Sequence, residues 1–177
     1  MATWREFETS APALAGLGKS RWEKVGLFLI GTLRKDGSVR ISPCEYLVFE
    51  GELWLGMMWQ SKKALDLVRD QRITIHSAVS NKDGKDGEFK VYGRVIDERD
   101  TSRRTAFGAF SEAETGFKPS EPYHLFRLAI SEAAFVVFGP EGKAEVEAAC
   151  AGSAVEIPEM YDPGDGSGHT VLHWRER

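Results

Sequence analysis

Two glycine-containing turn signals constrain the fold of this chain more than any other feature of its sequence. They are Asp-Gly at residues 36–37 and Glu-Gly-Glu at residues 50–52, and they separate apolar runs at residues 25–33, 39–49 and 53–58. Asp-Gly supplies the positive φ of a tight hairpin turn, so the runs on either side of it should pair as antiparallel strands. The three runs therefore predict a β-meander.

The rest of the chain alternates short apolar runs with polar turns. Helices are expected at residues 4–8, after Ser61, at residues 101–110 with Thr101 as the cap, and at residues 143–151, while residues 11–19 suit a loop or a weak helical turn. Further strands are expected at residues 72–80, 88–96, 125–130, 134–138 and 170–174, and loops at residues 81–87, 116–124 and 162–168. Six to seven short strands favour a closed or nearly closed antiparallel barrel, because closure removes exposed sheet edges.

The charge balance excludes a general attraction for polyanions. The 177 residues carry 23 basic and 27 acidic side chains, so the formal net charge is −4 and any anion site must be local. A hydrophobic content of 42% is typical of a globular protein, and the length favours a single domain over residues 1–177.

Cysteine spacing and targeting signals indicate the redox state of the cysteines and the expected cellular location. Cys44 and Cys150 have no paired spacing that indicates a disulfide framework or a zinc site, so we expect both to be reduced and structural. Neither a signal peptide nor an apolar run of membrane-spanning length is present, and a cytoplasmic location without membrane contact is expected.

The histidines give no support for a metal site. His76 is expected on a strand, where a lone histidine is usually structural, and His124 follows a proline-rich loop. His169 and His173 are four residues apart in an expected strand, which is poor geometry for holding one metal ion.

A pair of lysines at a helix start is the first candidate for a binding site. Ser61 suits an N-cap, and Lys62 and Lys63 then lie in the first turn, where the helix dipole disfavours cations by about 0.3–1 kcal/mol each. A bound phosphate would remove that repulsion, since unpaired N–H groups, a hydroxyl and two ammonium groups suit an anion. A solvated helix start is the alternative. Arg40, at the start of the second strand, has a guanidinium suited to phosphate, and the meander would bring it near Ser61.

The ordered set of motifs resembles a known family. Residues 31–75 read GTLRKDGSVRISPCEYLVFEGELWLGMMWQSKKALDLVRDQRITI. This run is similar to the core of the pyridoxamine 5′-phosphate oxidase-like family, with its D-G turn, its strand that opens with Arg, its G-S-R/K-K-A helix start and its R-D/N-P-R-V segment. The resemblance covers residues 25–96 well and extends loosely to residue 138. It implies a β-rich α+β fold, a six-stranded antiparallel split β-barrel with a few short helices.

The resemblance also implies a homodimer with one flavin mononucleotide (FMN) at each of two clefts between subunits. Residues implied at the FMN phosphate are Arg40, Ser61, Lys62 and Lys63. Residues whose backbone is implied to flank the isoalloxazine ring are Ile41, Ser42, Met57 and Met58. Weaker candidates for contacts to the cofactor, in part from the partner subunit, are Lys90, Tyr92, Trp174 and Arg175.

Departures from the family pattern argue against the vitamin B6 reaction. Glu45 stands where pyridoxamine phosphate oxidases usually have lysine, Gln60 replaces a glycine, and Gln71 replaces a proline. The terminal motif that grips pyridoxal phosphate is not recognisable in residues 169–177.

The leading hypothesis is a flavin-dependent oxidoreductase that acts on an unidentified small molecule. In such a site the protein supplies orientation and electrostatics, so a catalytic side chain need not exist. An F420-dependent reductase of the same superfamily is one alternative, and a non-catalytic flavin- or haem-binding module is another. A barrel for single-stranded nucleic acid is least favoured, because no basic aromatic face is evident.

Overall fold

Antiparallel pairing joins every strand of this protein into one curled sheet. A computed structural model describes residues 1–79, 82–152, 159–161 and 168–176. Within them the strands are β1 (Phe28–Leu33), β2 (Val39–Cys44), β3 (Leu47–Phe49), β4 (Glu52–Met58), β5 (Arg72–Ser77), β6 (Glu88–Asp97), β7 (Tyr123–Phe138), β8 (Glu159–Tyr161) and β9 (His169–Arg175). The strand order is β2-β1-β5-β6-β7-β4-β3, with β9 also paired to β7 and β8 paired to β9.

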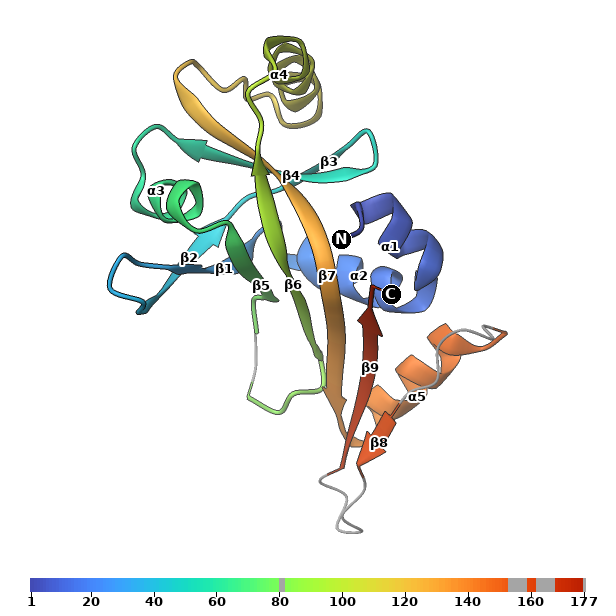
Figure 1. The fold of residues 1–177 in the computed structure, drawn as a ribbon. Helices are drawn as coiled ribbons and strands as arrows, with labels where there is room; N and C mark the ends of the chain where they lie inside the picture. Colours follow the sequence, from blue (N-terminus) through green and yellow to red (C-terminus); the bar gives the residue numbers. More distant parts are fainter. Residues whose placement is uncertain (80–81, 153–158, 162–167, 177) are drawn as a thin grey trace.

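Five helices in the described residues surround the sheet. They are α1 (Trp4–Ser10), α2 (Pro12–Val25), α3 (Lys62–Arg69), α4 (Thr101–Thr115) and α5 (Gly139–Cys150). Figure 1 shows α1 and α2 together beside the sheet, α4 at one end of it, and α3 between the β1–β2 and β3–β4 hairpins. The fold is therefore a β-rich α+β half-barrel, and its strand count is larger than the six that the resemblance implied.

Aromatic side chains fill the core between the sheet and the first two helices. Trp22 of α2 lies 5.3 Å from Trp4 and 4.8 Å from Phe89 between ring centroids, and all three are buried. Phe7 of α1 completes the cluster at 5.4 Å from Trp4. Large buried rings contribute strongly to stability through apolar area, so this cluster anchors the N-terminal helices to the barrel.

The meander prediction was right about the two hairpins and wrong about how they join. β1 pairs with β2 and β3 pairs with β4, as the turn signals indicated. The expected single strand at residues 39–49 is broken at Glu45 and Tyr46, because β2 and β3 lie at opposite ends of the strand order. Tyr46 instead stacks on Phe28 with ring centroids 4.8 Å apart. β4 consequently pairs with β7 and not with β2.

The two strands expected at residues 125–130 and 134–138 form one continuous strand, β7. The pairing of β6 with β7 shifts register after Tyr92, and Ser131 is the extra residue. The Ser131 hydroxyl donates to the Tyr92 carbonyl at 3.1 Å, so the irregularity is satisfied locally. Gly93 is required there, since a Cβ would lie 2.1 Å from the carbonyl oxygen of Ala129. A β-bulge thus replaces the expected break.

Helix boundaries also differ from the expectations. The weak turn expected at residues 11–19 is a 14-residue helix, α2, which starts with Pro12 at its first position and buries Leu14, Leu17 and Trp22. The cap of α4 is Asp100, which accepts from the backbone N–H of Arg103, and not Thr101. Most of the loop expected at residues 162–168 lies outside the described residues.

Candidate functional site

The start of α3 leaves a buried polar atom without a partner. Ser61 occupies the N-cap position in an extended conformation, as the sequence predicted, but its side chain caps nothing. Its Oγ is buried and has no hydrogen-bond partner among the described residues. An N-cap hydroxyl normally accepts a bond from an N–H of the first turn, and a buried polar group without a partner costs about 1–3 kcal/mol. A ligand acceptor at this point would relieve that cost.

The turn before α3 contains a residue in a backbone conformation that favours glycine. Gln60 has φ of 59°, in the left-handed region that favours glycine, and it stands at the position where the family pattern has glycine. Its backbone N–H donates to Nε2 of His124 at 3.3 Å. The His124 ring stacks on Trp59 with centroids 4.6 Å apart. His124 therefore holds the turn that presents Ser61, a role that its lone position in the sequence did not reveal.

The two lysines behave differently from each other. Lys62 is exposed and makes no ion pair or hydrogen bond with another described residue. Lys63 donates from Nζ to the carbonyl oxygen of Pro43 at 2.6 Å, which ties α3 to the end of β2 without neutralising the charge. Neither ammonium group has a carboxylate partner among the described residues, so the helix start carries two positive charges that the protein does not neutralise.

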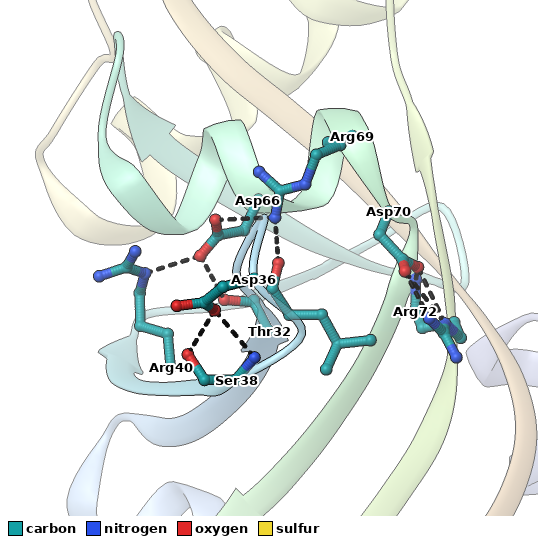
Figure 2. Close-up of polar contacts among 9 residues, drawn as sticks. Thr32, Asp36, Ser38, Arg40, Asp66, Arg69, Asp70 and Arg72 are labelled. Atoms are coloured by element: carbon teal, nitrogen blue, oxygen red, sulfur yellow. Dashed lines mark hydrogen bonds and ion pairs between the residues drawn. The ribbon is translucent and has the colours of Figure 1, made fainter.

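One buried carboxylate organises the cations farther along α3. Asp66 is only 4% exposed and accepts from Nε of Arg40 at 2.7 Å, from Arg69 at 3.1 Å and from the Thr32 hydroxyl at 3.1 Å. Burial alone would raise the pKa of Asp66, but these three donors outweigh it and hold the pKa below its ordinary value. Figure 2 shows Arg40 meeting Asp66 through one nitrogen while its other two point away from the carboxylate.

Arg40 thus reaches α3 as expected, by a different route. It was expected near Ser61 through β2–β4 pairing, whereas it actually meets Asp66 from the edge strand β2. β2 and α3 together carry four cationic side chains, those of Arg40, Lys62, Lys63 and Arg69, and one carboxylate, Asp66, which pairs with the two arginines. We call this region, with Ser61, the α3 corner; its local charge is positive although the chain as a whole is acidic.

Two open backbone edges lie beside the α3 corner. β2 ends the strand order, and it carries Ile41 and Ser42. β4 carries Met57 and Met58, and its pairing with β3 stops at Trp54, so residues 55–58 pair only with β7 among the described strands. Unpaired N–H and C=O groups on these two edges are available to hydrogen-bond the polar edge of a bound ring.

The remaining candidate residues lie away from α3 in the single chain. Lys90 pairs with Glu88 at 2.8 Å on β6. Trp174 packs edge-on against Phe7 at 5.0 Å, and Arg175 donates to Glu132 at 2.9 Å. Tyr92 lines an 880 Å³ hollow on the face of β1, β5 and β6 that points away from the core. Their assignment to a cofactor held between subunits stays a prediction.

The motifs of the sequence analysis did not predict a second hollow. A cavity of 830 Å³ lies over β4, between the β3–β4 hairpin and α4 with the segment that follows it. Its lining combines aromatic side chains with aliphatic, small polar and glycine residues and one carboxylate, that of Glu45. Its lining comes from four separate stretches of the chain, so no local motif marks it. Gly56 inside a strand and the run of Met57, Met58 and Trp59 are the signals that an inspection of the sequence offers.

The described part of the chain contains neither a cluster of metal-ligating side chains nor a helix able to span a membrane. No group of three or more His, Cys, Asp or Glu side chains there is arranged to hold a metal ion. None of the helices found there has both the length and the apolar character needed to cross a bilayer.

Comparisons with known proteins identify the fold. No family model and no curated protein sequence matches the chain. Solved structures do match: a putative pyridoxamine 5′-phosphate oxidase from Listeria innocua is 11% identical with a TM-score of 0.51, covering 65% of this chain and 91% of its own. A NimC/NimA family protein from Clostridium acetobutylicum is 17% identical with a TM-score of 0.52, covering 68% and 86%.

A third structural neighbour is named for the ligand that it binds. A haem-binding protein from Mycobacterium smegmatis is 15% identical with a TM-score of 0.54, covering 73% of this chain and 59% of its own. These neighbours include proteins of the family that the sequence resembles, and at such identities they show that this chain has their fold.

Proposed function

We propose that this protein is an FMN-dependent oxidoreductase of the pyridoxamine 5′-phosphate oxidase-like family, acting on a small molecule. The observation that carries the proposal is the unpartnered Ser61 hydroxyl at a helix start with two unneutralised lysines. The donors present fit a phosphate monoester, which accepts several charge-assisted hydrogen bonds at a helix N-terminus. The family that the sequence resembles binds FMN, and solved structures of that family share the fold of this chain.

Each residue of the α3 corner has a separate task in this proposal. Ser61 and the first N–H groups of α3 bind the phosphate, and Lys62 and Lys63 neutralise it. Arg40 supplies its two outward nitrogens, because Asp66 holds only Nε. Asp66 acts through Arg40 as a positioning residue. The open edges of β2 and β4 hold the ring through backbone groups at Ile41, Ser42, Met57 and Met58.

FMN supplies hydride transfer at its N5 atom when bound, so the protein needs to orient the ring and the substrate and to exclude water. The side chains near the corner are cations, one carboxylate already saturated by donors, and a neutral hydroxyl. None of them is arranged as a general acid or base, which accords with chemistry that resides in the cofactor.

A homodimer is part of the same proposal. Val39 and Ile41 on β2 are 58% and 63% exposed, and Ile41 lines the 880 Å³ hollow with Leu29 and Leu33. Apolar surface of this kind is typical of an interface, and a two-fold contact through this face would complete a cleft that one chain leaves open. Sedimentation of the cofactor-bound protein at micromolar concentration should therefore show a dimer, and a monomer would contradict this part of the proposal.

Two other cofactors suit the same corner. F420 carries a phosphodiester and haem carries two carboxylates, and a fold neighbour is a haem-binding protein. The visible spectrum after incubation with each compound separates them, since FMN gives two bands in the blue and near ultraviolet, F420 one violet band and haem a Soret band. We expect a stoichiometric complex with FMN. A complex with haem or F420 alone would overturn the assignment.

The α3 corner is tested by removing its exposed charges. In the double variant Lys62→Ala/Lys63→Ala, FMN affinity should fall by at least about a hundredfold, since bonds to charged groups contribute about 1.5–3 kcal/mol each. Lys19→Ala/Lys118→Ala is the matched control, because it removes two exposed lysines that each make one surface ion pair on other elements. Equal FMN affinity in both double variants would show that the corner does not bind the phosphate.

A further inference from the structure

The turn between β4 and α3 has an unfavourable residue at its third position. It runs from Met58 to Ser61 and is closed by the N–H of Ser61, which donates to the carbonyl oxygen of Met58 at 3.1 Å. Gln60 has a φ of 59°, whereas Trp59 is not among the described residues with positive φ. A positive φ at the third position alone is the pattern of a type II turn, which takes glycine or asparagine there. Glutamine is therefore held in a conformation that glycine would adopt more easily.

A type I turn is the alternative that glutamine favours. Types I and II differ by a rotation of the central peptide through roughly 180°, and in type I the third residue has a φ of about −90°. The central peptide of this turn joins Trp59 to Gln60. Because the N–H and C=O of one peptide point in opposite directions, the rotation exchanges the group that faces a given neighbour. A contact from outside the turn must therefore hold the peptide in the type II orientation.

His124 of β7 supplies that contact. The backbone N–H of Gln60 donates to Nε2 of His124 at 3.3 Å. In the type I orientation, the carbonyl oxygen of Trp59 would face the same nitrogen, and two acceptors cannot form a hydrogen bond with each other. Only the orientation with positive φ at Gln60 pairs the peptide with a neutral imidazole.

The ring of His124 is fixed and neutral, as this contact requires. It is 8% exposed, stacks on Trp59 with centroids 4.6 Å apart and lies parallel to Phe126 at 6.1 Å. Burial lowers the pKa of His124, a change that the charge of Asp97 opposes and that of Arg104 supports. At neutral pH the proton of the ring is on Nδ1, and Nε2 is the acceptor.

We propose that His124 is a positioning residue of the phosphate site in the α3 corner, and that its neutral Nε2 replaces the glycine that the family pattern has at position 60. The inference rests on the proposed function, because it concerns the same site. The turn leads directly into Ser61, the N-cap whose buried hydroxyl has no partner among the described residues. With its central peptide held, the turn presents Ser61 and the first N–H groups of α3 in one arrangement, so phosphate binding needs little ordering.

Two variants of His124 separate the acceptor from the ring. His124→Gln keeps an acceptor without the ring, and His124→Phe keeps a ring without the acceptor. We expect His124→Phe to weaken FMN binding by about tenfold, equivalent to about 1.4 kcal/mol, and His124→Gln to stay within about threefold of the parent. The reverse order of affinities would show that His124 acts only by packing against Trp59, and would overturn the proposal.

A change at Gln60 should rescue the loss of the acceptor. Glycine adopts a positive φ without strain, so Gln60→Gly/His124→Phe should keep the type II turn and regain FMN affinity to within about threefold of the parent. Gln60→Ala/His124→Phe is the matched control, because alanine disfavours a positive φ as glutamine does. It should bind FMN as weakly as His124→Phe. Equal affinities in the two double variants would overturn the proposal.

Amide exchange in the protein without FMN separates this inference from the proposed function. The N–H of Gln60, followed by NMR, should exchange at least about tenfold faster in His124→Phe than in the parent and in His124→Gln. The N–H of Leu65, which donates to the carbonyl oxygen of Ser61 inside α3, is the internal control and should exchange alike in all three. Equal exchange of the Gln60 N–H in all three proteins would overturn the proposal at any FMN affinity. The expected exchange in a parent that binds no FMN would instead overturn the phosphate site, and with it the role of His124 there, while leaving its hold on the turn.

Discussion

Replacing Ser61 by alanine should weaken FMN binding without destabilising the protein. In a conventional N-cap, serine to alanine costs about 1 kcal/mol, which lowers the midpoint of thermal unfolding by about 2–4 °C in a chain of this size. Ser61 makes no capping bond, and its Oγ is buried without a partner. Ser61→Ala should therefore leave the unfolding temperature of the protein without FMN unchanged, or raise it.

The same change should weaken FMN binding. If the Ser61 hydroxyl donates to a phosphate oxygen, its loss removes a bond to a charged group, which contributes about 1.5–3 kcal/mol. FMN affinity should then fall by about ten- to a hundredfold. Because the loss of FMN affinity is not accompanied by a loss of stability, a single variant separates the binding role of Ser61 from a structural role.

The measurement combines thermal unfolding without FMN with a fluorescence titration of FMN. Thr3→Ala is the control for a working cap, because the Thr3 hydroxyl accepts from the N–H of Glu6 at 3.3 Å and also donates to the Glu6 carboxylate. It should lower the unfolding temperature and leave FMN affinity alone. If Ser61→Ala behaves like Thr3→Ala in both measurements, Ser61 is an ordinary helix cap and does not bind the phosphate.

Two further predictions concern groups near the proposed ring. Glu45→Lys replaces a negative charge by a positive one beside Met57 and Met58, which favours the negative charge of reduced flavin. Potentiometric titration should show that the reduction midpoint of bound FMN rises by tens of millivolts, where about 30 mV corresponds to 1.4 kcal/mol. Equal midpoints in the variant and the parent would place Glu45 away from the ring. His124 has its pKa lowered from 6.5 mainly by burial, so the unfolded chain binds its proton at higher pH than the native protein. The contribution of neutral His124 to the free energy of unfolding is fully present above about pH 6.5 and decreases as the pH falls below that value. Denaturant unfolding at several pH values should show this decrease in the parent protein, and His124→Gln should make it smaller.

Local signals in the sequence predicted local structure well. The Asp-Gly and Glu-Gly-Glu turns gave both hairpins, and the pattern after Ser61 gave α3, because in each case the decisive residues lie within a few positions of one another. The structural neighbours agree with the family that the ordered motifs suggested.

Long-range pairing was beyond the sequence patterns. Nothing between residues 39 and 49 shows that β2 and β3 belong to opposite ends of the strand order, since that depends on β4 pairing with β7 about seventy residues away. The bulge at Ser131 hid the continuity of β7 for a similar reason, because its cause is the backbone of Gly93 on another strand.

The candidate site shows the same division. Ser61, Lys62 and Lys63 are adjacent in the sequence, so the helix start that they form could be predicted from it, and their role as a binding site stays a prediction. The Asp66 carboxylate that holds Arg40 was missed because its contact depends on β2 lying against α3. The sequence shows only that His124 follows a proline-rich loop, and the fold brings it to the N–H of Gln60. The cavity over β4 was missed because its walls come from distant segments.

A comparison of FMN with riboflavin tests the central claim most directly. The two differ only in the phosphate, so the ratio of their dissociation constants isolates the contribution of the α3 corner. Titrations followed by flavin fluorescence should give FMN at least about a hundredfold the affinity of riboflavin in the parent protein, equivalent to about 2.7 kcal/mol. The ratio should be much smaller in Lys62→Ala/Lys63→Ala, where only Ser61, Arg40 and the N–H groups of α3 still meet the phosphate. Equal affinities for FMN and riboflavin in the parent protein would contradict the account.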